Sequence, residues 1–97
     1  MNITIHKTDS ACIVTLVGRL DTNTAPKLES TLNDITTSRV VIDCSALEYV
    51  SSAGLRVILA AHKRLAVSGE GLTLRGVGDT VRSVLDMTGF SRILTIE

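Results

Sequence analysis

The chain has 97 residues, 44% of them hydrophobic and only 2% aromatic, which predicts one α/β domain over residues 1–97 with a core of Val, Ile, Leu and Ala. Ten basic and ten acidic residues give a formal net charge of zero and form no run of one sign. Nucleic acids and anionic membranes need clustered Lys and Arg, so neither is expected as a partner, and the apolar segments are shorter than the roughly twenty residues of a membrane span.

The first two predicted elements are strands. Residues 1–7 alternate apolar and polar side chains, with Ile3 and Ile5 on one face, and residues 12–17 form a second, mainly apolar run. The turn-forming residues 8–10 connect the two runs closely, which predicts an antiparallel hairpin. The start of the chain also lacks the basic, apolar and small-residue regions of a secretory signal, so we expect a cytoplasmic protein.

A helix and a buried strand are predicted next. Residues 18–23 should leave the second strand, Thr24 is placed to cap a helix, and Pro26 is favourable in its first turn. Apolar residues then recur at helical spacing at Leu28, Leu32 and Ile35. Residues 40–42 are three β-branched residues in a row that end in Asp43, which fits a central strand buried on both faces.

The second helix should begin near Ser51 or Ser52. The side that packs on the sheet is marked, at steps of three or four residues, by Leu55, Ile58, Leu59, His62, Leu65 and Ala66. Gly69 and Gly71 then end the helix, and residues 72–74 begin a fourth strand.

The last predicted elements are a helix and a short strand. Asp79 is expected to cap the helix, Gly89 to end it and Phe90 to pack behind it. Residues 93–96 form a final strand or an extended tail. The order ββαβαβαβ predicts an α/β fold, in which a mixed, mostly parallel sheet starts with an antiparallel hairpin and carries helices packed on it.

The cysteines and histidines are interpreted as structural. Cys12 and Cys44 lie in or beside apolar segments without a second Cys or a His at ligand spacing, so we expect buried reduced thiols. His62 is on the apolar stripe and His6 is in an edge strand, and neither has a convincing metal-ligand neighbour in the sequence. No metal site and no cofactor are therefore expected.

The segment from Asp43 to Arg56 is the most informative, because it leads from a buried strand into a helix. Ligands and partners of parallel α/β folds gather at this end of the strands. Spacing alone favours Ser51 and Ser52 as helix caps. A helix N-terminus would also tolerate a phosphate on one of them, because its N–H groups are unpaired and its dipole end is positive. Gly54 in the first turn indicates close approach by another group.

Three segments together resemble the STAS family, the domain shared by sulphate transporters and anti-sigma factor antagonists. They are residues 18–21 (GRLD), residues 43–55 (DCSALEYVSSAGL) and residues 85–90 (LDMTGF). The resemblance covers nearly the whole chain and implies a STAS-like fold.

The resemblance also implies a phosphorylation switch. In family members that act as antagonists, a serine two positions before the signature glycine is phosphorylated, and Ser52 occupies that position here. The implied partners are an anti-sigma factor with serine kinase activity, bound by the unphosphorylated form, and a serine phosphatase that resets the protein. Many antagonists have Asp just before the phosphorylated serine, so Ser51 is a rival acceptor.

A docking surface for the partner is implied around the same junction. We expect it to include Asp21, Thr22, Asn23, Ser51, Gly54 and Arg56. For Asp21, an ordinary turn in which the carboxylate accepts hydrogen bonds from nearby N–H groups is an equally good interpretation. Arg56 should point outward, whereas Leu55 fits the core stripe.

Two other functions are considered. A hydrolase with Ser52 as nucleophile is disfavoured, because no glycine stands two residues before it and neither histidine has sequence evidence of proximity to it. The sequence therefore predicts a binding protein and not an enzyme. A STAS module without a switch, acting as an accessory subunit of a transporter or of a larger signalling assembly, stays open as the alternative.

Overall fold

The computed structural model describes residues 1–36, 39–69 and 71–97. Within these residues, five strands form one sheet in the order β1-β2-β3-β4-β5. The pair β1 and β2 is antiparallel and the other neighbouring pairs are parallel, which confirms the predicted mixed sheet and element order. The elements are β1 (Asn2–Lys7), β2 (Cys12–Leu20), α1 (Ala25–Asn33), β3 (Arg39–Val50), α2 (Ser52–Ser68), β4 (Gly71–Arg75), α3 (Asp79–Thr88), the 3-10 helix η1 (Phe90–Arg92) and β5 (Thr95–Ile96).

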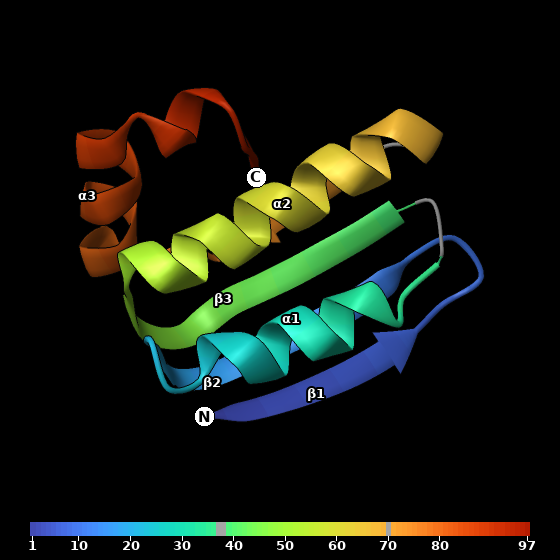
Figure 1. Cartoon of the computed structure of the whole chain (residues 1–97), viewed down its shortest axis with the longest axis horizontal. Coiled ribbons are helices and arrows are strands. Elements are labelled where there is room, and N and C mark those ends of the chain that lie inside the picture. Colours follow the sequence, from blue (N-terminus) through green and yellow to red (C-terminus); the bar gives the residue numbers. More distant parts are fainter. Residues whose placement is uncertain (37–38, 70) are drawn as a thin grey trace.

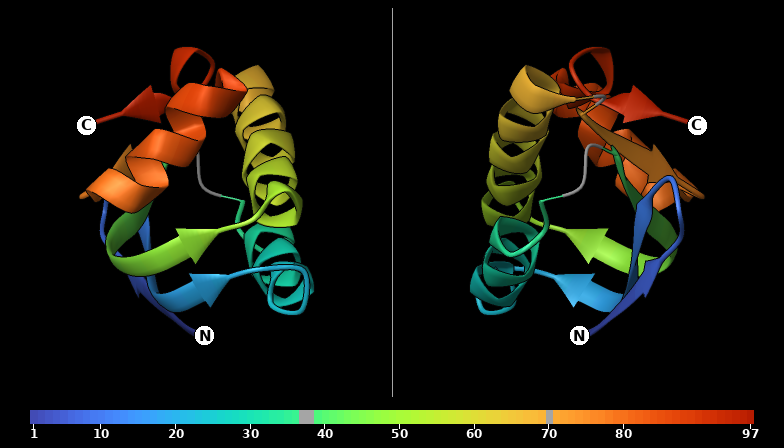
Figure 2. Two further views of the ribbon diagram at one scale, coloured as in Figure 1. Left: turned by 90° about the vertical axis from the view of Figure 1, so that its left-hand side faces the viewer. Right: turned by 90° about the vertical axis from the view of Figure 1, so that its right-hand side faces the viewer.

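The helices cover one face of the sheet. Figures 1 and 2 show α1 and α2 side by side over that face, with α3 set crosswise near the C-terminus. Alternate residues of the strands point into this layer, because successive side chains of a strand face opposite ways. The fully buried side chains come from both layers and include Val14, Leu16, Ile42 and Leu74 of the strands and Leu28, Leu55, Ile58 and Leu85 of the helices. Burying each such side chain contributes about 1.5–3 kcal/mol.

Two strands are longer than the sequence predicts. β2 continues through residues 18–20, which the sequence pattern places outside it, and β3 runs on from Asp43 to Val50. The reason is that polar residues here lie on the solvent side of the sheet, where Arg75 Nη2 lies 3.3 Å from Asp43 Oδ2. A polar residue in these strands is thus no sign of a strand end.

Of the two predicted N-caps, Thr24 is confirmed in position and Asp79 is wrong. Thr24 precedes α1, but its hydroxyl does not cap the helix, since it accepts from the Asp21 N–H at 2.8 Å and donates to the Arg19 carbonyl at 2.9 Å. Asp79 is the first residue of α3, and Gly78 holds the cap position without a side chain to contribute. The predicted end of α3 is confirmed, because Gly89 adopts φ +80°, which favours glycine.

The structural interpretations of Cys12, Cys44 and His62 are confirmed. Both thiols are free and buried, and burial raises the pKa of Cys44 to about 12, so it is inert at neutral pH. The His62 ring is half-buried, and its Nδ1 accepts a hydrogen bond from the Leu72 N–H at 3.2 Å. This bond ties α2 to β4.

Candidate functional site

Two strand-helix junctions meet at the carboxyl end of the sheet. Leu20, the last residue of β2, pairs with Val50, the last residue of β3. One residue further along, the Ser51 N–H donates to the Leu20 carbonyl at 2.8 Å. The turn between β2 and α1 and the start of α2 therefore lie beside each other, as predicted (Figure 1). We call these two segments, residues 21–24 and 51–54, the switch junctions, after the phosphorylation switch that the family resemblance implies there.

The first switch junction is built around Asp21. Its Oδ1 accepts hydrogen bonds from the Asn23 N–H at 2.9 Å and the Thr24 N–H at 3.1 Å. Partial loss of water acts to raise the pKa of Asp21, but the hydrogen bonds from Thr24 and Asn23, with Arg19 nearby, hold this pKa below its ordinary value. Asp21 is therefore an ionised turn-forming residue, while Thr22 and Asn23 are exposed.

The two serines of the second switch junction differ in what their hydroxyls do. Ser51 has an extended backbone and is the N-cap of α2, where its Oγ accepts from the Gly54 N–H at 3.2 Å. Ser52 is the first residue of the helix and is exposed. Across the residues that the structure describes, the Ser52 hydroxyl makes no hydrogen bond. Ser51 is thus occupied by the fold and Ser52 is available.

Gly54 is a glycine because Leu20 lies against it. A Cβ atom at this position would be 2.5 Å from Leu20 Cγ and 2.8 Å from Leu20 Cδ2, closer than packed carbon atoms approach. Gly54 is also buried, so the close approach that the sequence indicated comes from within the protein. Gly54 thus sets how near β2 and α2 lie, and its part in partner binding stays a prediction.

A groove between α1 and α2 opens next to the switch junctions. It measures about 390 Å³ and is lined by Thr22, Ala25, Pro26, Glu29, Ala53, Arg56, Val57 and Ala60. Arg56 is exposed and takes part in this lining, while Leu55 is buried, both as predicted. The groove itself is not predicted from the sequence, and the signal that could have indicated it is the small residues Ala53 and Ala60 on one flank of α2.

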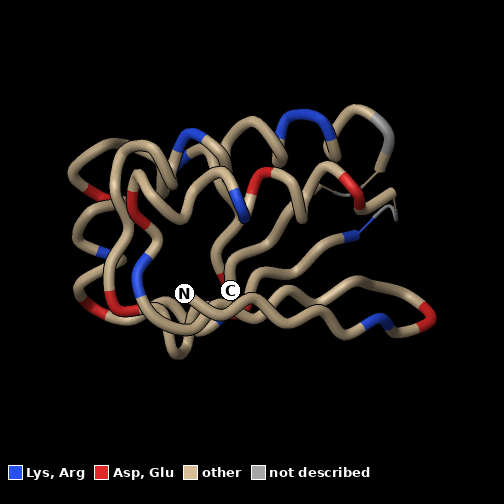
Figure 3. The backbone as a smooth tube through the Cα atoms, turned by 60° about the horizontal axis from the view of Figure 1, so that its bottom comes forward, with Lys and Arg blue, Asp and Glu red and all other residues tan. Residues whose placement is uncertain are grey.

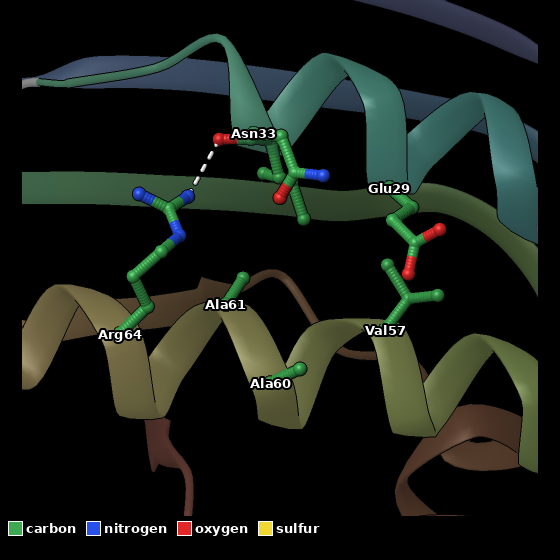
Figure 4. Close-up of a pocket in the computed structure, with 7 residues that line it drawn as sticks. Glu29, Asn33, Val57, Ala60, Ala61 and Arg64 are labelled. Carbon is green, nitrogen blue, oxygen red and sulfur yellow. Dashed lines mark hydrogen bonds between the residues drawn. The ribbon is translucent and has the colours of Figure 1, made fainter.

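The groove continues toward the far end of the two helices. Figure 4 shows this part, a cavity of about 130 Å³ in which Glu29 and Asn33 of α1 face Val57 and Ala60 of α2. Arg64 closes it by reaching across to α1, where its Nη2 donates to the Leu32 carbonyl at 2.7 Å. The same carbonyl also accepts a hydrogen bond from the Ile35 N–H at 3.1 Å, so Arg64 adds a second donor to a carbonyl at the end of α1.

Charges of both signs are spread over the fold. Figure 3 shows Lys and Arg interspersed with Asp and Glu along the backbone, in keeping with the balanced sequence. Beside the switch junctions, the Arg19 guanidinium stacks on the Tyr49 ring, 4.4 Å from its centroid. Across the described residues there is no cluster of three His, Cys, Asp or Glu that could hold a metal ion. In the same residues, no helix has the length and apolar character to cross a membrane.

The comparisons with known proteins agree with this fold. The STAS domain matches residues 2–97. BtrV of Bordetella bronchiseptica, a protein named as an anti-sigma factor antagonist, is 39% identical over 99% of this chain and 85% of its own length. The anti-sigma-B factor antagonist of Listeria monocytogenes is 30% identical over 100% of this chain and 89% of its own.

A solved structure is also similar. The crystal structure of an anti-sigma factor antagonist from Mycobacterium paratuberculosis superposes with a TM-score of 0.88 at 26% identity, covering 98% of this chain and 83% of that one. Together with the match over nearly the full length, this similarity identifies the chain as a member of the STAS domain family.

Proposed function

We propose that the chain is an anti-sigma factor antagonist, which binds an anti-sigma factor at the switch junctions and loses this binding when Ser52 is phosphorylated. The observation that carries the proposal is the exposed Ser52 hydroxyl at the start of α2, free of internal hydrogen bonds within the described residues. The names of the full-length relatives support the class of partner, and they make the protein a binding module rather than an enzyme.

The start of α2 can carry a phosphate without unfolding. The first N–H groups of a helix have no partner within it, and the positive end of the helix dipole favours an anion. A phosphate adds about −1.5 to −2 charges at neutral pH to a surface that a partner would cover. The modification therefore repels the partner while the fold stays the same, and a coupling of about 1–3 kcal/mol would weaken binding roughly 5- to 150-fold.

Ser52 is a better phosphate acceptor than its neighbour. The Ser51 Oγ is needed as the cap of α2, and a phosphate on it would remove the bond to the Gly54 N–H that fixes the first turn. The proposed modifying enzyme is the anti-sigma factor itself, acting as a serine kinase. It transfers the γ-phosphoryl group of ATP to the Ser52 Oγ, the hydroxyl proton passes to a base of the kinase, and ADP leaves. A serine phosphatase would return the hydroxyl by hydrolysis.

Phosphorylation by the cognate kinase tests the acceptor. The full chain, Ser52→Ala and Ser51→Ala are each incubated with the kinase and ATP, and the phosphate is located by mass spectrometry. We expect one phosphate on Ser52 in the full chain and in Ser51→Ala, and none in Ser52→Ala. Phosphate on Ser51 would reassign the acceptor, and phosphate on neither serine would instead favour a STAS module without a switch.

A further inference from the structure

We propose that Arg56 is the internal counter-ion of the phosphate on Ser52, so that phosphorylation turns Arg56 away from the groove as well as adding negative charge. The inference rests on the proposed function, since it concerns the same phosphoserine. It adds a second effect to the switch, because the partner meets both a new anion and a groove that has lost its exposed cation.

The spacing along α2 brings the two side chains together. Ser52 and Arg56 are four residues apart on one helix, and residues at that spacing lie on the same face about 5–6 Å apart at their Cβ atoms. An anion placed four residues before a cation is the more favourable order of such a pair. A guanidinium also binds phosphate oxygens through two parallel hydrogen bonds, which a shorter or less planar cation does not.

Arg56 is the arginine near the start of α2 that is left to pair with the phosphate, because Arg19 and Arg64 already have partners. Arg64, one of the other cations of the helix, is bound to the Leu32 carbonyl of α1. Arg19 stacks on Tyr49 of the neighbouring strand. In the described parts of the chain, Arg56 makes neither a hydrogen bond nor an ion pair within 4.0 Å.

The acidic groups nearby explain why Arg56 rests in the groove before modification. Glu29 of α1 lines the same groove as Arg56, so the guanidinium has an acidic residue across from it at longer range. Asp21, ionised by its turn, is on the adjacent junction. A phosphate on Ser52 carries about −1.5 to −2 charges and is on the same helix face, so it competes with Glu29 for Arg56.

The second pKa of the phosphate tests the pairing directly. Phosphoserine is installed at position 52 of the full chain by genetic encoding, which removes the need for a kinase or a partner, and its titration is followed by phosphorus NMR. An i,i+4 pair of about 0.2–0.5 kcal/mol corresponds to a pKa shift of about 0.2–0.4 unit. We expect Arg56→Gln to raise the phosphate pKa by that amount, and Arg56→Lys to raise it less.

Lys63 provides the matched control, because it is an exposed cation of the same helix that lies two turns beyond Arg56. Lys63→Gln should leave the phosphate pKa unchanged, and the effect of Arg56→Gln should largely disappear in 1 M salt, where the Debye length is about 3 Å. An equal phosphate pKa in the unmodified sequence background and in Arg56→Gln overturns the inference. This test does not involve the partner. If the phosphate on Ser52 did not change partner binding, that separate result would overturn the proposed function.

Discussion

The two switch junctions are built alike but use their polar residues differently. In the first, Asp21 and Thr24 hold each other and the backbone in a closed turn. In the second, Ser51 alone caps the helix, and the hydroxyl of Ser52 is left over. A polar side chain that is hydrogen-bonded within the fold would have to give up that bond to serve a partner or an enzyme. A side chain without such a bond can be modified without loss of a stabilising interaction.

The contact between Gly54 and Leu20 sets how closely the two junctions approach, so a larger residue at position 54 should have a large effect on stability. Gly54→Ala would press a methyl group into Leu20, and we expect overpacking to lower the free energy of unfolding by about 1–3 kcal/mol. Urea denaturation measures this change.

A double substitution provides the control for that prediction. Leu20→Ala alone should cost about 2–5 kcal/mol, because it removes a fully buried side chain. In the Leu20→Ala background, however, Gly54→Ala should cost less, because of the three close atoms only the Leu20 carbonyl oxygen, 3.3 Å from the added Cβ, remains. An equal cost of Gly54→Ala in both backgrounds would show that Leu20 is not the reason for the glycine.

The two serines differ in their hydrogen bonds, so replacing each of them with alanine should have different effects on stability. Ser51→Ala removes the helix cap and should destabilise the protein by about 1 kcal/mol. Ser52→Ala removes an exposed hydroxyl that has no partner among the described residues, and it should change stability by less than about 0.5 kcal/mol. The free energies of unfolding of the two variants, measured side by side in urea, test this difference. Equal losses, or a larger loss for Ser52→Ala, would contradict the assignment of the cap to Ser51.

The contribution of Asp21 to stability should depend on pH, and this is the smallest of the expected effects. Because the pKa of Asp21 is below its ordinary value of 3.8, its ionised form stabilises the fold above that pH, and this contribution disappears as the pH falls through the lower folded pKa. Asp21→Asn keeps an acceptor oxygen but no charge. The stability advantage of the unsubstituted chain over Asp21→Asn should therefore be present at pH 6 and shrink below about pH 4. Denaturation curves at several pH values measure the difference in the free energy of unfolding between the two proteins. A difference that does not change with pH would argue against the lowered pKa of Asp21.

Most of the fold follows from patterns of apolar residues. Side chains are buried at strand or helix spacing in residues 12–17, in residues 40–42 and in the stripe from Leu55 to Leu65. These segments form the predicted elements because burial of their apolar side chains stabilises them. The extensions of β2 and β3 could not be predicted in this way because polar residues such as Arg19 and Asp43 interrupt the apolar runs, although a sheet open on one face accepts polar residues there.

The site could be predicted only in part. Ser51 and Ser52 are both good caps by residue type, and only the Ser51 Oγ bond to the Gly54 N–H separates their roles. Gly54 signalled a close approach, but the partner in that contact, Leu20, is 34 residues away along the chain and depends on the pairing of β2 with β3. The groove could not be predicted, because it depends on how α1 and α2 pack beside each other, and no local sequence pattern indicates this packing.

The central claim is that a phosphate on Ser52 ends binding without disturbing the fold. The most direct test measures the affinity of the anti-sigma factor for the unmodified full chain and for the chain with phosphoserine at position 52, together with the thermal stability of both. We predict a loss of affinity of roughly 5- to 150-fold at nearly unchanged stability. Equal affinities would contradict the account, and so would a loss of affinity that is accompanied by unfolding.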